Sequence, residues 1–190
     1  MQDSPPPEIQ WFNTHYIPPE DRLRLACALA AGGTETLWVT QRLANALVKK
    51  LLEWLDKQTV QDRRFAEVDH RVAQKSALAR APKQAPRQLP EAESEGAGWL
   101  VRSVGINSGK NLIILTFKGD AGKDDAAKDD PAKNDVERAL RLRFNPQHLR
   151  QWLNVLSKQY RRAGWPGDVW PDWMIEAAGH QPSVTSDLLH

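Results

Sequence analysis

Two stretches of the chain alternate between apolar and polar residues, which is the pattern of a strand with one buried face. RLRLACAL, which begins at Arg22, has leucine or cysteine at every second position, and RALRLRF, which ends at Phe144, has leucine or phenylalanine. IQWFNTHYI at residues 9–17 is rich in aromatic and β-branched residues, so a further strand is expected there. After the first alternating stretch, Gly32-Gly33 predicts a turn and LWV predicts a short return strand.

Two segments carry apolar residues at helical spacing, and each follows a strand directly. Residues 41–58 have Thr40 before them as a candidate N-cap, and residues 146–163 begin with Pro146 after Asn145. The predicted apolar faces are Leu43, Leu47, Leu51, Trp54 and Leu55 in the first helix, and Leu149, Trp152, Leu153, Leu156 and Tyr160 in the second. Both segments are therefore expected to be amphipathic helices that pack on a sheet.

The second half of the chain repeats the plan of the first. WLVRSV, NLIILTFKG and RALRLRF precede the second helix, with GINSGK expected as a turn-rich link. The pattern predicts an α+β fold, an antiparallel sheet with two amphipathic helices on one face, and suggests a pseudo-duplicated (β-β-β-α)×2 arrangement. Identity between the halves is slight, so chance repetition of strand, turn and helix stays open as the alternative.

We expect one domain with several segments. They are a disordered leader at 1–8, the first half at 9–58, a helix extension and Pro-rich linker at 59–97, the second half at 98–163 with a mobile loop at 119–137, and a Trp-rich tail at 164–190. The extension is expected because Val68 and Val72 continue the 4,3 spacing of Leu47 and Leu51. Polar Lys75 falls on the same seam, which argues against a continuous coiled coil.

The tail gathers three tryptophans just after the second helix. Gly164 is the natural left-handed residue beyond the helix, which places Trp165 against Tyr160 as part of the helix cap. Trp170 and Trp173 have two interpretations. In the first, they bind a partner; in the second, the tail folds back and buries them. The stretch that carries them is expected to be non-helical.

Composition narrows the setting without naming a function. The formal net charge is +2, with 41% hydrophobic and 26% charged residues, so no global charge draws the protein to nucleic acid or membrane. Cys27 is the only cysteine, which excludes an internal disulfide and fits a reducing compartment. No basic, apolar leader and no membrane-length apolar run is present, so a cytoplasmic location is expected.

Motifs for catalysis, metals and cofactors are lacking. The five histidines are widely spaced, and the Asp-rich loop lacks the residue order of a calcium site. Gly105, Gly109 and Lys110 lack the spacing of a phosphate loop. We therefore expect no metal site and no cofactor, and binding rather than catalysis.

The arginines of the alternating stretches suggest a second kind of site. They lie out of phase with the buried residues, so they are expected on the sheet face opposite the helices together with an aromatic ring: Arg22, Arg24, Trp38, Arg141 and Arg143. If the strands are neighbours, such a face can hold single-stranded nucleic acid. The alternative is that these charges only keep outward strand positions soluble.

Two functions follow from these patterns. The first is a non-enzymatic adaptor or assembly protein that engages a macromolecular partner through Trp170 and Trp173, with self-association left open. The second is single-stranded nucleic-acid binding through the arginine face. No membrane partner is expected.

Overall fold

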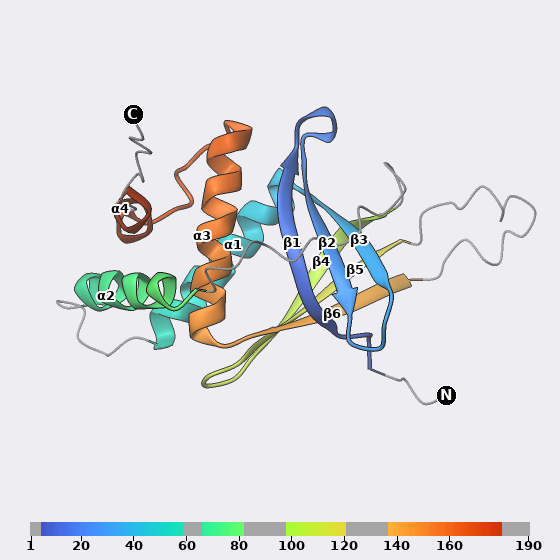
Figure 1. Cartoon of the computed structure of the whole chain (residues 1–190), viewed down its shortest axis with the longest axis horizontal. Helices are drawn as coiled ribbons and strands as arrows, with labels where there is room; N and C mark the ends of the chain where they lie inside the picture. Colours follow the sequence, from blue (N-terminus) through green and yellow to red (C-terminus); the bar gives the residue numbers. More distant parts are fainter. Residues whose placement is uncertain (1–4, 59–65, 82–97, 121–136, 180–190) are drawn as a thin grey trace, which may run out of the picture.

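Six strands form one mixed sheet in the order β1-β2-β3-β4-β5-β6, and four α-helices accompany it in the residues that are described (Figure 1). The computed structural model describes residues 5–58, 66–81, 98–120 and 137–179. The elements are β1 (Ile9–Ile17), the 3₁₀ turn η1 (Pro18–Glu20), β2 (Arg22–Leu29), β3 (Thr34–Thr40), α1 (Gln41–Gln58), α2 (Ala66–Ala79), β4 (Trp99–Ser108), β5 (Ile113–Asp120), β6 (Glu137–Phe144), α3 (Pro146–Ala163) and α4 (Asp172–Gly179). The α+β class predicted from the sequence is confirmed.

Each half contains an antiparallel three-stranded meander followed by a helix. In the first half the turn between β2 and β3 uses Gly32 and Gly33 at φ 95° and 89°, a region that residues with a Cβ rarely adopt. In the second half GINSGK is a link only at its end. Ile106 and Ser108 pair with Leu115 and Ile113 and so extend β4, and the turn begins at Gly109. The pseudo-duplication of the halves stays a prediction.

The sheet is mixed rather than wholly antiparallel, which corrects the sequence-based expectation. β3 and β4 pair in parallel, with Leu37 opposite Trp99 and Trp38 opposite Leu100. The helical segment between these strands returns the chain to the same end of the sheet, and such a crossover makes the next strand run parallel. A second parallel contact, between Glu8 and Arg141, brings β6 beside the start of β1.

This contact also orders part of the predicted leader, because the backbone N–H of Arg141 donates to the carbonyl of Pro7 at 2.8 Å. Residues 1–4, most of the linker (82–97) and most of the predicted mobile loop (121–136) lie outside the described residues. The flanks of that loop, Gly119, Asp120 and Glu137, belong to β5 and β6.

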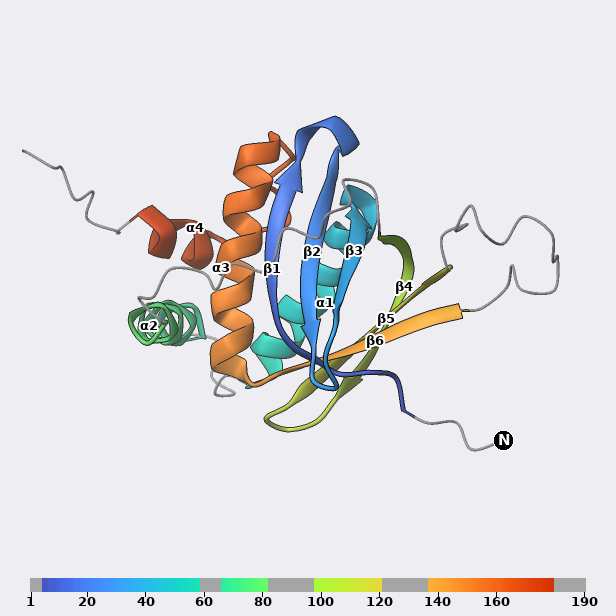
Figure 2. The same cartoon turned by 45° about the vertical axis from the view of Figure 1, so that its right-hand side comes forward.

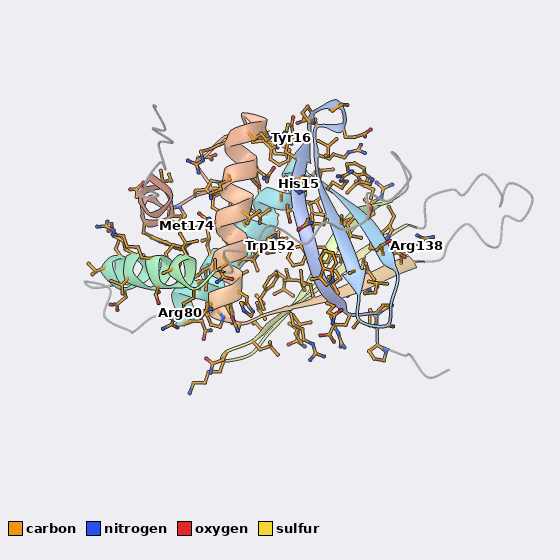
Figure 3. All side chains as sticks on the ribbon, in the orientation of Figure 1. His15, Tyr16, Arg80, Arg138, Trp152 and Met174 are labelled. Carbon is orange, nitrogen blue, oxygen red and sulfur yellow. The ribbon has the colours of Figure 1, made fainter. Side chains whose placement is uncertain are left out.

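α1 and α3 cover one face of the sheet, and both halves share a single core. Trp152 of α3 contacts both edge strands of the sheet (Figure 3). Its ring stacks on Phe144 of β6, with 5.0 Å between the ring centres, and meets Phe12 of β1 edge-on at 5.6 Å. Its Nε1 donates to Oγ1 of the buried Thr14 at 3.1 Å. The buried indole N–H therefore has the partner that its burial requires.

The predicted helix ends are confirmed in detail. Thr40 Oγ1 accepts from the N–H of Leu43, and Asn145 Oδ1 accepts from the N–H of His148, so both helices begin at capped positions.

At the end of α3, Gly164 is left-handed at φ 67° and donates to the carbonyl of Arg161, while Trp165 donates to the carbonyl of Tyr160. The rings of Tyr160 and Trp165 meet edge-on at 5.0 Å, as this helix stop predicts.

α2 and α4 form an outer helical layer on the side of α3 away from β1 (Figures 1 and 2). α2 is not a straight continuation of α1, because His70 Nε2 lies 3.2 Å from Asp56 Oδ1, whereas a single helix would separate these residues by about 21 Å. Residues 59–65, between the two helices, lie outside the described part. α4 corrects the expectation that the stretch around Trp173 is non-helical.

Gly119 is the tightest point of the second meander. A Cβ there would overlap the carbonyl oxygen of Leu100 and lie 2.6 Å from Cε3 of the buried Trp99. Gly119→Ala is expected to lower the free energy of unfolding in urea by about 1–3 kcal/mol, as overpacking does. The control is Gly105→Ala, whose Cβ would have its nearest neighbour at 3.7 Å and should change stability by less than about 1 kcal/mol. Equal effects of the two variants would contradict this account.

Candidate functional site

The tryptophans expected to bind a partner lie inside the chain. Trp170 and Trp173 are 7% and 6% exposed. The ring of Trp170 meets Tyr160 edge-on at 5.2 Å, and Trp173 stacks on the imidazole of His70 at 4.8 Å. Both rings therefore hold the outer helical layer against α3, which is the second interpretation that the sequence allowed.

The burial pattern of α2 is inverted relative to an ordinary amphipathic helix. Its buried positions are His70, Gln74 and Ala77, whereas Val68 and Val72 are 54% and 62% exposed. The sequence-based register placed these valines on the buried seam of α1, and the structure corrects this. We call Val68, Val72, Lys75 and Ala79, which share one side of the helix at 4,3,4 spacing and are all exposed, the outer face of α2.

A chain of polar contacts lies beneath α2. Nη2 of Arg150, on α3, lies 3.0 Å from Nδ1 of His70, and Nε2 of His70 lies 3.2 Å from the carboxylate of Asp56. Arginine can only donate, so Nδ1 of His70 accepts, and the ring proton resides on Nε2 and is donated to Asp56. His70 in its neutral form thus connects the end of α1 to α3.

Two amide side chains also fix α2 to α3, at positions that follow His70 along α2. Gln74 Nε2 donates to the carbonyl of Arg150 at 3.2 Å, and Gln151 Nε2 donates to the carbonyl of Ala77 at 2.8 Å. Each crosses more than 70 residues of sequence, so these bonds define how the two helices are placed against each other.

Arg150 is the buried charge at the centre of the layer. It is 5% exposed, and burial lowers its pKa to about 10, with the carboxylate of Asp56 opposing the shift. The group therefore stays protonated at neutral pH. The guanidinium carbon lies 5.3 Å from the ring centre of Trp173, so the indole face supplies part of the missing solvation. Within the described residues, Nη1 of Arg150 and Oε1 of Gln74 are buried without a hydrogen bond.

The structure brings together only part of the predicted arginine face. In the strand register Arg24 lies opposite His15 of β1 and opposite Trp38 of β3. All three lie on the face away from the core. Arg22 lies at the same end of β2 and contacts Glu20 at 3.7 Å.

The other two arginines lie elsewhere on the sheet. Arg141 and Arg143 are on β6, which is not a neighbour of β2, and both contact the carboxylate of Glu8, at 3.6 and 3.2 Å. Glu8 precedes His15 by seven residues, or about 23 Å of extended strand. The five predicted residues therefore do not form one continuous patch.

Two kinds of reactive site considered in the sequence can be checked in the described residues. No group of three His, Cys, Asp or Glu side chains among them converges as a metal site. Burial raises the pKa of the Cys27 thiol to about 12, which removes it as a nucleophile at neutral pH. The Asp-rich loop considered as a calcium site lies outside the described residues.

Comparisons with known proteins add no assignment. A scan against protein-family models, a search of curated proteins and a search of solved structures each found no match for this chain. Among the helices of the described part, none is long and apolar enough to cross a membrane.

The polar contacts that join Arg150, His70 and Asp56 predict that the stability of the protein depends on pH. The pKa of His70 is lowered from 6.5, mainly by burial and then by Arg150, while Asp56 and Asp69 oppose the shift. The folded protein therefore takes up this proton less readily than the unfolded chain, so the contribution of His70 is present above pH 6.5 and is lost as the pH falls below that value.

His70→Gln tests this, because glutamine can accept from Arg150 and donate to Asp56 without titrating. We expect a loss of about 1 kcal/mol at neutral pH. The fall in unfolding free energy from about pH 7.5 to about pH 5.5 should be smaller than in the parent. The pKa of His15 is also lowered, by burial and then by Arg24 and Arg162, so both chains should carry His15→Gln. Identical pH slopes would rule out His70 as the titrating group.

Proposed function

We propose that this chain is a non-enzymatic binding protein, in an adaptor or assembly role, whose macromolecular partner docks on the outer face of α2. One observation carries the proposal: α2 turns His70 and Gln74 inward and leaves Val68 and Val72 in solvent. Buried polar groups beneath an exposed apolar face are the informative exception to ordinary burial. A partner that covers the valines gives this arrangement a reason.

The contacts beneath α2 support the proposal because they make the helix a fixed platform. Its inner side is attached by the contacts of His70, Gln74 and Ala77 with α3, and Trp173 stacks on it from α4. Two valines one turn apart are the spacing that a helix uses to insert anchors into an apolar groove. Binding to a preorganised helix avoids much of the entropy lost when a segment must fold on its partner.

The proposal gives Trp170 and Trp173 a different role from the one first expected. They act as internal supports of the docking helix, and the contact with the partner moves to Val68 and Val72. Truncating either tryptophan should weaken binding only by loosening the outer helical layer.

A photoreactive phenylalanine analogue in place of Val72 tests the surface in extract of the cells that make the protein. We expect a discrete crosslinked species, because this position lies in the proposed interface, and mass spectrometry then identifies the partner. Val155 of α3, which is 39% exposed, is the matched position and should give no discrete species. Adding Val68→Ser should remove the adduct at position 72. The same adduct pattern at both positions would refute the proposal.

Single-stranded nucleic-acid binding is the second candidate, in the reduced form that the strand order allows. Its supporting observation is the row His15, Arg24 and Trp38, which places a guanidinium beside an indole on adjacent strands. A base can stack on the half-buried ring of Trp38 while the arginine contacts phosphate.

Fluorescence anisotropy with a labelled oligothymidylate at low ionic strength tests this candidate. If it is correct, Arg24→Gln reduces the slope of log affinity against log salt by about 1, and Trp38→Ala weakens binding by about 1–3 kcal/mol. Lys49→Gln, which removes one positive charge from the exposed side of α1, should change neither. Absence of binding by the parent chain eliminates the candidate.

A further inference from the structure

We infer that the partner covering the outer face of α2 is the α2 helix of a second copy of this chain, packed antiparallel across a twofold axis. The inference rests on the proposed function, since it names the occupant of that same surface. A twofold interface uses one patch on both copies, so the patch must be complementary to itself when it is reversed. The sequence and exposure of α2 meet this condition.

The apolar positions are complementary under such a reversal. With the axis between residues 73 and 74, Val68 of one copy faces Ala79 of the other, and Val72 faces Lys75. Lysine can lay its aliphatic stem along a valine while its ammonium group reaches the edge of the interface. Each valine therefore meets a small side chain or an aliphatic stem rather than a buried charge.

The charges of α2 are also complementary under the reversal. Its first turn is acidic, with Glu67 and Asp69, and Glu67 also pairs with Arg71 of the same helix at 2.9 Å. The basic residue Lys75 lies in the second half of α2, and Arg80 follows its last residue. Antiparallel packing sets the acidic end of each helix beside the basic end of the other, and opposes the two helix dipoles favourably. Parallel packing would set like charges side by side.

The size of the surface indicates the strength expected. α2 is 14 residues long, or about 21 Å, and a single helix pair of this length falls at the low end of specific interfaces. Association is therefore expected to be weak and dependent on concentration. Ile175 of α4, 54% exposed in the same outer helical layer, is the next large apolar side chain available to widen the contact.

Charge reversal at one end of α2 tests the pairing. Glu67→Lys with Asp69→Lys makes both ends basic, and Lys75→Glu with Arg80→Glu makes both ends acidic. Sedimentation equilibrium should show the parent associating toward twice its 21.5 kDa mass as concentration rises. Each reversed variant alone should remain monomeric, because like charges then meet at both ends.

Mixing the two reversed variants is the decisive step. Each end of one helix then meets an end of opposite charge on the other, so a one-to-one heterodimer should form and be seen by native mass spectrometry. Lys49→Glu on α1 is the control charge reversal and should associate like the parent. Circular dichroism checks that the helices persist, and Val68→Ser with Val72→Ser should weaken association without altering any charge.

The outcomes separate this inference from the proposed function. A parent chain that stays monomeric at the highest concentration, or reversed variants that associate as the parent does, overturns self-pairing. If position 72 then crosslinks to a different polypeptide while position 155 does not, the proposed function stands without it. If neither association nor a crosslink at position 72 is found, both fall.

Discussion

The rotation of α3 about its own axis is the constraint on which the outer helical layer depends, and Trp152 fixes it. The ring of Trp152 packs on Phe144 and Phe12, and its N–H is bound by Thr14, so this side of α3 must face the place where the two ends of the sheet meet. Two residues along a helix correspond to about 200° of rotation. Arg150 is therefore directed away from the sheet, toward the position that α2 occupies.

Arg150 in turn decides which side of α2 faces inward. Rotating α2 by half a turn would bury Val68 and Val72, but these are already almost half buried, so about half of the usual 1.5–3 kcal/mol per side chain remains to be gained. The same rotation would remove the hydrogen bond of the buried guanidinium to His70, a loss of about 1.5–3 kcal/mol, and would break the side-chain hydrogen bonds of Gln74 and Gln151. The free energy of the polar contacts therefore outweighs that of burying the valines, which stay exposed.

The features that were predicted correctly from the sequence are those that depend on residues close together along it. The caps at Thr40 and Asn145, the glycine turn after β2 and the Gly164–Trp165 helix stop each depend on residues a few positions apart, and all are present. The parallel pairing of β3 with β4 depends on how an intervening helical segment returns, which no short pattern encodes.

The orientation of α2 could not be predicted for the same reason. It is set by Arg150, 80 residues from His70, and periodicity alone assigned the valines to the inside because it counts apolar residues without their partners. One signal was available: His70 and Gln74 repeat at helical spacing as regularly as Val68 and Val72 do. A helix with two such stripes can bury either one, and its contact with Arg150 of α3 determines which stripe is buried.

The strand order determines where the arginines of the sheet lie, just as the buried Arg150 determines the orientation of α2. Alternation correctly assigned Arg24 and Arg141 to the outer side of their strands, but alternation says nothing about which strands are neighbours. Because the meanders follow one another in sequence, β2 and β6 are not paired strands, and Glu8 at the start of β1 contacts Arg141 and Arg143. The positive charge of the sheet is thereby divided, whereas Val68 and Val72 lie one turn apart on the same side of α2. A partner that needs an extended basic track finds less here than one that needs a short rigid helix.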